Sequence, residues 1–200
     1  DDIDDMRAIK SGQELELMRL SAYLGNVIHG LLLQNIDVGV SELEICLAAD
    51  LEMARFEASA MGELWEPMGN RGVSISITSG WKTARNHRNP GARKIQPGDV
   101  ILSGTAPEVG GYMSELERTI FVGKPTDKHK KYFDLATKAQ QIAFDAIRPG
   151  RKCSDVERDV NYFLEENGIY ELTRTHIGHG IGTEGHELPF LDLGDDTLIQ

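Results

Sequence analysis

The segment Thr175–Pro189 reads Thr-His-Ile-Gly-His-Gly-Ile-Gly-Thr-Glu-Gly-His-Glu-Leu-Pro and holds three of the chain's six histidines. Because glycine permits positive φ angles and close backbone approach, His179, with glycine on both sides, is expected on a tight segment that presents its ring. Histidine changes charge near neutral pH and is the commonest metal ligand. A polar turn would also fit a single Gly-His-Gly triplet. Since His186 and Glu187 follow at short range, the cluster favours a functional site.

The overall composition is that of a globular protein of 200 residues, 40% hydrophobic and 26% charged. This length allows one domain, or two fused halves, with a buried core. The net charge of -11 argues against nucleic-acid binding, because such proteins carry a basic surface. No apolar run approaches the roughly 20 residues of a membrane span. Cys46 and Cys153 fit buried free thiols in a reducing compartment, so we expect a cytoplasmic protein with no nucleic-acid or membrane partner.

Apolar residues at helical spacing predict four helices. Their expected ranges are about 12–34, 42–58, 127–147 and 154–167. Three would begin with a capping box, an N-cap serine paired with a glutamate three residues later: Ser11–Glu14, Ser41–Glu44 and Ser154–Glu157. Leu43, Leu47 and Leu51 carry the pattern of the second helix. His29 has no ligand-type neighbours and is expected at the surface or the edge of the core.

Alternation of apolar and polar residues predicts strands near 73–77, 100–102 and 112–122. The chain also repeats one plan. In each half a long helix ends in Ile-x-x-Gly, a capping box opens another helix, and a histidine-bearing segment follows, with His87 in the first half and residues 176–186 in the second. The repeat predicts duplicated α+β halves with a site between them.

These residues resemble the pita-bread fold family, which includes methionine aminopeptidase, Xaa-Pro aminopeptidase, prolidase and the metal-independent creatinase. The motifs that carry the resemblance cover nearly the whole chain: Ser79-Gly80 with His87, Gly98-Asp99-Val100-Ile101-Leu102, Gly111-Tyr112, Arg118-Thr119, Gly178-His179-Gly180-Ile181-Gly182 and His186-Glu187-x-Pro189. The resemblance implies an α+β pita-bread fold with pseudo-two-fold duplicated halves.

The same resemblance sets the expected boundaries. Residues 1–10 would be a linker or N-terminal extension, and 11–200 the catalytic domain, incomplete at its C-terminus because two glutamate-bearing strands would follow Gln200. The chain is therefore expected to be a fragment, inactive as it stands, of a protein that forms a homodimer at full length.

In the peptidases of the family a metal pair is bound by two aspartates, the Gly-His-Gly histidine and two later glutamates. Of these five positions the resemblance gives His179, while Gly104 takes the place of the first aspartate and Glu115 that of the second. Carboxylates neutralise two divalent charges and fix their separation, which Gly104 cannot do. The sequence therefore predicts a degenerate site for Mn, Co or Zn, weak or empty at the first position and compatible with a single ion.

Glu117 is the second departure from the peptidases, which usually have a small hydroxyl residue there. Creatinase has a similar Leu-Glu-Arg-Thr segment and uses its glutamate to hold a guanidinium-type substrate without metal. A carboxylate reads such a planar cation by charge-assisted hydrogen bonds. An ordinary ion pair of Glu117 at a strand edge is an equal alternative. Tyr112 and Arg118 are expected beside it as substrate-binding residues.

Three hypotheses for the function follow. The first is a C–N bond hydrolase of the Xaa-Pro aminopeptidase or prolidase type acting on short peptides, with His179 as a metal ligand and His87, His186 and Glu187 in catalysis. The second is a metal-independent, creatinase-like amidino or amide hydrolase of small molecules, with His87 as general acid–base and Glu117 as the substrate anchor. The third is a pita-bread module that binds a peptide without catalysis.

Overall fold

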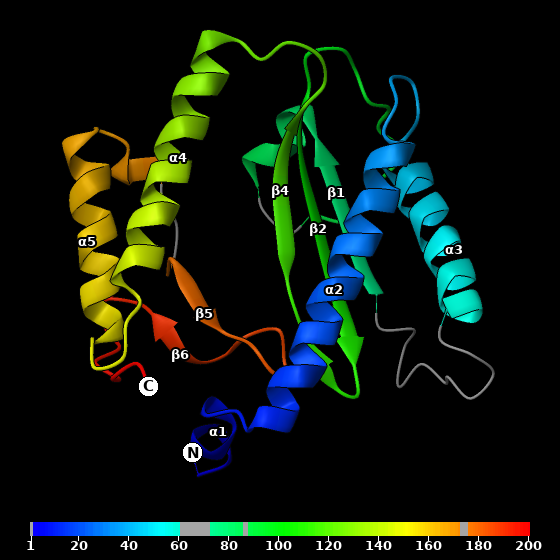
Figure 1. Ribbon diagram of the computed structural model, residues 1–200. Coiled ribbons are helices and arrows are strands. Elements are labelled where there is room, and N and C mark those ends of the chain that lie inside the picture. The colour runs from blue at the N-terminus through cyan, green and yellow to red at the C-terminus, as the bar shows by residue number, and fades with distance from the viewer. Residues whose placement is uncertain (1, 61–72, 86–87, 173–175) are drawn as a thin grey trace. The chain divides into compact units, whose positions relative to one another are not determined.

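The computed structural model describes residues 2–60, 73–85, 88–172 and 176–200, and the chain divides into two compact units. One unit is residues 11–125, and the other joins residues 1–10 to residues 126–200. Figure 1 shows their elements, and each unit is described by itself. Apart from the short helix near the N-terminus, which belongs to the second unit, each unit has two helices followed by antiparallel strands, which agrees with the duplication predicted from the sequence.

The unit of residues 11–125 consists of two helices against an antiparallel sheet (Figure 1). The helices are α2 (Gly12–Asn35) and α3 (Glu42–Ala60). The strands are β1 (Val73–Ser79), β2 (Val100–Val109), β3 (Tyr112–Met113) and β4 (Leu116–Phe121), and a short 3-10 helix, Gly80–Ala84, follows β1. β2 lies in the centre and pairs with the other three. The predicted strand 112–122 is thus in two pieces, because Ser114 and Glu115 interrupt the ladder.

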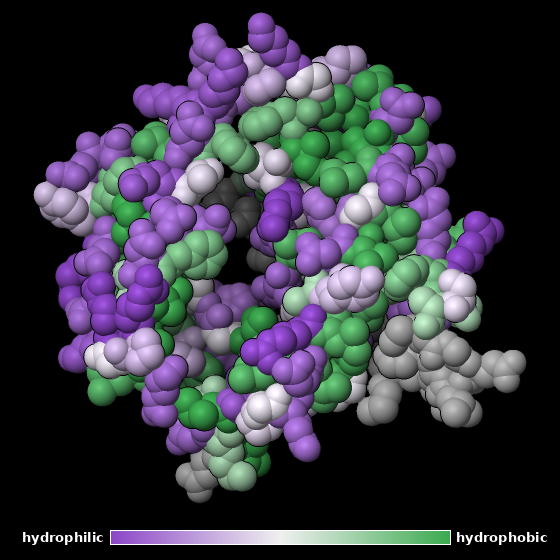
Figure 2. Space-filling view, viewed as in Figure 1, coloured by the Kyte–Doolittle hydropathy of each residue, from purple (hydrophilic) through white to green (hydrophobic). Residues whose placement is uncertain are grey.

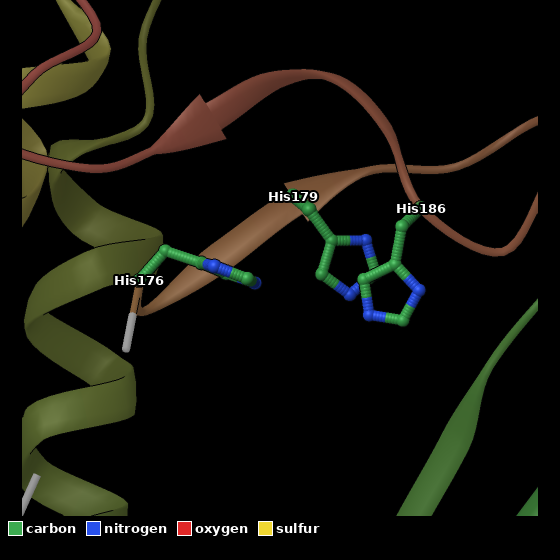
Figure 3. A group of neighbouring side chains, drawn as sticks. All are labelled: His176, His179 and His186. Carbon is green, nitrogen blue, oxygen red and sulfur yellow. The ribbon is translucent and has the colours of Figure 1, made fainter. Parts of the chain in front are cut away.

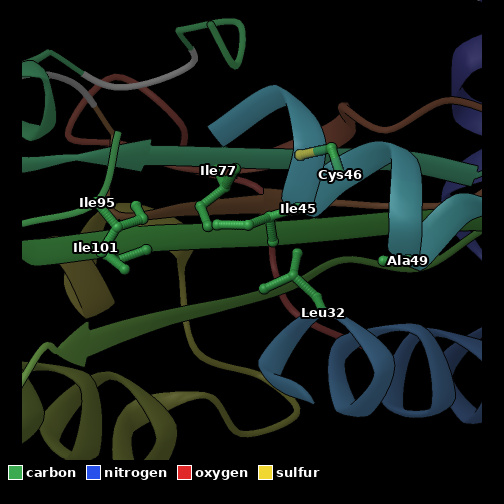
Figure 4. Packing of buried hydrophobic residues seen from close by; sticks show 7 residues of the cluster. All are labelled: Leu32, Ile45, Cys46, Ala49, Ile77, Ile95 and Ile101. Atoms are coloured by element: carbon green, nitrogen blue, oxygen red, sulfur yellow. The ribbon is translucent and has the colours of Figure 1, made fainter. Parts of the chain in front are cut away.

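The core of this unit lies between the helices and one face of the sheet. Its members come from α2, α3, β1, β2 and the segment before β2, and Figure 4 shows them: Leu32, Ile45, Cys46, Ala49, Ile77, Ile95 and Ile101. Successive side chains of a strand point to opposite faces, so the burial of Ile77 and Ile101 places Ser76, Thr78 and Gly104 on the other face. That second face is polar.

The core-facing side of α3 is not the one that the sequence pattern indicated. Leu43, Leu47 and Leu51 recur every four residues, yet they are 45%, 59% and 53% exposed. Ile45 and Ala49 are fully buried instead. Both sets have helical spacing, and the periodicity alone cannot choose between two apolar stripes. In Figure 2 apolar side chains gather over the region of α2 and α3.

The unit of residues 1–10 and 126–200 contains α1 (Asp2–Ala8), α4 (Asp127–Ala146) and α5 (Cys153–Glu166). A short 3-10 helix, Tyr170–Leu172, leads to the hairpin of β5 (Gly178–Gly180) and β6 (Glu187–Leu191). α4 packs on α5, while α1 and α5 both contact β6. The segment 1–10, predicted as a linker or N-terminal extension, therefore contains a helix that packs on the histidine-bearing hairpin.

Two of the three predicted capping boxes are confirmed and the third is wrong. Ser11 with Glu14, and Ser41 with Glu44, exchange both hydrogen bonds of the box. Ser154 lies inside the first turn of α5, and its hydroxyl donates to Asp196 at 2.7 Å. The first backbone N–H groups of α5 donate to carbonyl groups of residues 195 and 197, which replace a local cap.

The two cysteines are buried free thiols, as predicted, and burial raises the pKa of Cys46 to about 12. None of the helices in the described part of the chain is long and apolar enough to cross a membrane.

The assignment of the buried face of α3 predicts a difference between two alanine substitutions. Ile45→Ala removes a fully buried side chain and should lower the free energy of unfolding by about 2–5 kcal/mol. Leu47→Ala on the exposed stripe of the same helix is the control, with an expected change below about 0.5 kcal/mol. Urea unfolding followed by circular dichroism measures both. Equal losses would contradict the assignment.

Candidate functional site

The β5–β6 hairpin brings three histidines together. His176 precedes β5, His179 lies within it, and His186 directly precedes β6. Gly178 pairs with Leu191 and His179 with Phe190, and the register shifts after His179. Figure 3 shows His176 directed toward the other two rings. The rings of His179 and His186 stack at 3.9 Å between centroids, and that of His176 lies 5.6 Å and 6.3 Å from them.

The three imidazoles form a group with the composition and spacing of a metal site. One ligand nitrogen of each histidine lies within 4.8 Å of the others. His176 and His179 are half-buried, and His186 is exposed. Nδ1 of His179 lies 2.9 Å from the carbonyl oxygen of Gly180. A carbonyl oxygen only accepts, so Nδ1 carries the proton and Nε2 the lone pair.

Glu187, next to His186, is a buried carboxylate surrounded by donors. One oxygen accepts from Lys10 at 2.9 Å, and the other accepts from Arg7 at 2.5 Å. The Thr183 hydroxyl and the Glu184 N–H donate to it as well, at 3.1 Å and 2.9 Å. These bonds tie α1, the turn after β5 and the start of β6 to one side chain.

The charge of Glu187 is fixed by these contacts. Burial by itself would raise the pKa of Glu187, but the hydrogen bonds from Lys10 and Arg7 outweigh it and lower the pKa to about 2. A general acid–base exchanges its proton most efficiently with a pKa near the working pH. The contacts of Glu187 therefore fit a residue that positions the hairpin, while the catalytic role predicted from the sequence stays a prediction.

Gly182 of the Gly-His-Gly-Ile-Gly motif is needed for the same cluster. A Cβ atom at position 182 would lie 2.5 Å from a carboxylate oxygen of Glu187 and 2.8 Å from Cε of Lys10. Such contacts are too short, so any residue with a Cβ atom at this position would displace the ion pair. The last glycine of the motif thus makes room for the ion pair of Glu187 and Lys10.

A second group of polar residues lies on the open face of the sheet in the unit of residues 11–125. Ser76 of β1, Gly104 of β2 and Glu117 of β4 are cross-strand neighbours in one row. A Cβ atom on Gly104 would lie 2.8 Å from Oγ of Ser76 and 3.4 Å from Oε1 of Glu117. The Glu117 side chain thus extends over Gly104, toward the space that a longer residue at 104 would fill.

This row borders a cavity of about 310 Å³. Hydroxyl groups and charges of both signs line it, from Ser76, Thr78, Arg88, Glu117, Arg118 and Thr119. A carboxylate beside guanidinium and hydroxyl groups can bind a small polar molecule by charge-assisted hydrogen bonds.

Known proteins resemble this chain in sequence and in structure. The model of metallopeptidase family M24 matches residues 16–200. The chain belongs to metallopeptidase family M24. An Xaa-Pro dipeptidase of Pyrococcus horikoshii is 26% identical over 202 residues, which cover 100% of this chain and 54% of that protein. A creatinase of Bacillus sp. is 26% identical over 180 residues, 90% of this chain and 43% of the relative.

The fold is that of solved family M24 structures. The prolidase from Pyrococcus furiosus superposes with a TM-score of 0.87 at 25% sequence identity, covering 99% of this chain and 56% of that one. This likeness confirms the predicted α+β pita-bread fold. The chain spans about half the length of these relatives.

Each unit offers only part of the ligand set expected for a metal pair in family M24. In the unit of residues 11–125, position 104 has no side chain, and Ser76 and Glu117 border the space where one would begin. Glu115 is an exposed residue between β3 and β4. In the other unit, His179 and its two histidine neighbours offer nitrogen donors suited to one transition-metal ion. The residues present fit a single ion on the hairpin better than a carboxylate-bound pair.

The remaining predicted site residues do not form one group in the described part of the chain. His87 lies outside the described residues. The Tyr112 hydroxyl donates to Glu14 of α2 at 2.6 Å. Arg118 lines the cavity and donates to the carbonyl oxygen of Glu117 at 2.7 Å. His176, which received no role from the sequence, is brought into the group by the hairpin.

Two buried polar contacts in the unit of residues 11–125 could not be predicted from the sequence. Glu42 at the start of α3 is fully buried and accepts from Ser79, Lys82 and the Gly91 N–H, which fixes the chain on both sides of residues 86–87. His29 of α2 lies 2.9 Å from the Ser103 hydroxyl, and burial, assisted by Arg118, lowers its pKa. His29 is therefore a buried residue of the helix–sheet interface, which agrees with the core-edge alternative and not with the surface alternative.

Removal of the Glu187 charge should destabilise the protein in a pH-dependent way. The pKa falls from an ordinary 4.5 to about 2 in the folded state, so the charge contributes about 3 kcal/mol above pH 4.5. That contribution is lost as the pH falls from about 4.5 toward 2. Glu187→Gln should lower the free energy of unfolding by about 3 kcal/mol at pH 7, and by progressively less below pH 4.5. Urea unfolding at several pH values measures the difference.

The matched control is Glu184→Gln, because Glu184 also pairs with Arg7 but its side chain is 66% exposed. Its expected cost is below about 1 kcal/mol. A Glu187→Gln variant as stable as the control at pH 7 would show that the ion pairs do not hold the hairpin.

Proposed function

We propose that the protein hydrolyses C–N bonds of short peptides, in the manner of an Xaa-Pro dipeptidase or aminopeptidase. The observation that carries this proposal is the group of three imidazoles on the hairpin of a chain in metallopeptidase family M24. The name of the Pyrococcus relative as an Xaa-Pro dipeptidase supports the substrate class.

In this proposal His179 is the first metal ligand, and its Nδ1–H bond to Gly180 holds the ring in the tautomer that a ligand needs. A divalent ion held by His179 would supply Lewis acidity for the hydrolysis. Glu187 holds the hairpin through Lys10 and Arg7, so that the backbone next to His186 is fixed. His87 remains the proposed partner of the scissile carbonyl.

The metal site is proposed to be degenerate. Gly104 offers no carboxylate, and Glu115 is the one replacement that the motif suggests. A single ion needs fewer carboxylates for charge balance than a pair does. Mn, Co and Zn are the ions to be tested, and the protein is proposed to be a homodimer that acts in the cytoplasm.

A second function is favoured by the position of Glu117. Its carboxylate lies over Gly104 at the edge of the cavity, where it could accept bidentate hydrogen bonds from a planar cationic group. This arrangement supports a creatinase-like hydrolase that works without metal on a small amidino or amide compound. The Bacillus creatinase among the relatives agrees with it.

A turnover assay separates the two functions. Protein with its natural ends, loaded with Zn²⁺ or Co²⁺, should hydrolyse Xaa-Pro dipeptides, and a chelator should abolish the activity. His179→Ala should lower kcat/KM by at least about 100-fold. The control His129→Gln should not change it, because glutamine is a usual residue at this capping-box position.

Hydrolysis of a guanidino compound that a chelator does not reduce would instead establish the second function. In that case Glu117→Gln should raise KM at least about 10-fold through loss of the charge-assisted bonds. Absence of turnover with both substrate classes would contradict both hydrolase proposals.

A further inference from the structure

We propose that the cavity on the polar face of the sheet binds small zwitterions, with Glu117 holding the cationic end and Arg88 selecting a carboxylate at the other end. The inference rests on the second proposed function, which gives Glu117 the cation of a substrate. It adds the opposite anchor, a residue that received no role from the sequence, and so narrows the class of substrate.

The two charged groups of the cavity are both without an ion-pair partner. Arg88 and Glu117 line the same cavity, yet within the described part of the chain neither pairs with the other or with any further charged side chain. Arg93 of the same unit, by contrast, donates to both carboxylate oxygens of Asp99, at 2.6 Å and 2.8 Å. The guanidinium and the carboxylate of the cavity are therefore available to one molecule that carries both opposite charges.

The backbone that follows Arg88 is anchored to the rest of the unit. The carbonyl oxygen of Asn89 accepts from Nζ of Lys82 at 3.3 Å, and the Gly91 N–H donates to the buried carboxylate of Glu42 at 3.0 Å. These contacts fix the segment from which the side chain of Arg88 reaches the wall of the cavity.

The guanidinium of Arg88 also packs on an aromatic ring. Its Cζ lies 5.8 Å from the centroid of Trp81, a residue that is 73% exposed. A cation–π contact orients a guanidinium without using its N–H groups. Because the planar fork of donors stays available, a carboxylate can bind it through two parallel hydrogen bonds.

The remaining lining suits a small polar molecule. The volume of about 310 Å³ is at the small end of the range for ligand sites. Hydroxyl groups of Ser76, Thr78 and Thr119 add donors and acceptors to the wall. A ligand with only a negative charge would be repelled by Glu117, and one with only a positive charge by Arg88. A zwitterion satisfies both groups.

The first test compares matched ligands on the unaltered chain. The guanidino derivatives of acetate, propionate and butyrate are titrated by calorimetry, each beside its own primary amide, which keeps the cation and lacks the negative charge. We expect the acid that binds best to bind at least about 10-fold more tightly than its amide, because only the acid accepts charge-assisted hydrogen bonds from Arg88. Equal affinities of acid and amide, or no binding of either, would overturn the proposal.

The second test repeats the titrations with variants of Arg88. Arg88→Gln should abolish the preference for the acid and leave the affinity for the amide unchanged. Arg88→Lys should keep part of the preference, since lysine retains the charge and lacks the planar fork. The matched control is Arg85→Gln, an exposed arginine that does not line the cavity, and it should keep the full preference. A folded Arg88→Gln protein, as judged by circular dichroism, that still prefers the acid would contradict the role of Arg88.

Glu117 should act on the other end of the ligand. Glu117→Gln should weaken the binding of acid and amide by similar factors, each at least about 10-fold, because both ligands carry the cation. A variant that loses affinity for the acid alone would contradict the assignment of the two ends.

These results can be separated from turnover. A preference for the acid that depends on Arg88, in a protein that hydrolyses neither guanidino compounds nor dipeptides, would support the inference and count against the proposed function. Hydrolysis of a guanidino acid with a KM that Arg88→Gln does not change would support the function and contradict the inference.

Discussion

The histidine hairpin depends on a buried carboxylate that must be compensated. The Glu187 side chain is 5% exposed, and a charge so far from water is tolerated only when donors surround it. Lys10 and Arg7 come from the other end of the chain. Their ion pairs with Glu187 therefore couple the position of α1 to the conformation of the β5–β6 hairpin. Gly182 is part of the same constraint, since any side chain there would displace the ion pair.

In the other unit, a glycine and a carboxylate are likewise neighbours, on the polar face of the sheet. Gly104 has no side chain, and Ser76 and Glu117 border the space above it, so the carboxylate on this face comes from β4. A carboxylate on a different strand, with a longer side chain, cannot reproduce a ligand geometry defined to a few tenths of an ångström. This is the physical reason to consider both a single-ion site and recognition of an organic cation in this protein.

Local signals in the sequence predicted local structure well. The capping boxes of α2 and α3 depend on residues three positions apart, and both formed. Where the competing partner lies far away in sequence, prediction failed. The hydroxyl of Ser154 donates to Asp196 instead of capping its own helix. Packing against the sheet determines which stripe of α3 is buried. Likewise the pairing of Glu187 with Lys10, 177 residues apart, has no signature in a single sequence. His179 could be identified from its glycines, but the grouping with His176 required the hairpin.

The central claim is that buried ion pairs at Glu187 hold a metal-binding arrangement of histidines. The most direct measurement is the zinc affinity of Glu187→Gln relative to the unaltered chain, by calorimetric titration of folded protein at pH 7. In this account the carboxylate acts by positioning the hairpin, so we expect one zinc ion per chain to be retained with affinity about 10–100-fold weaker. An unchanged affinity would show that the histidines are arranged without Glu187 and would contradict the account.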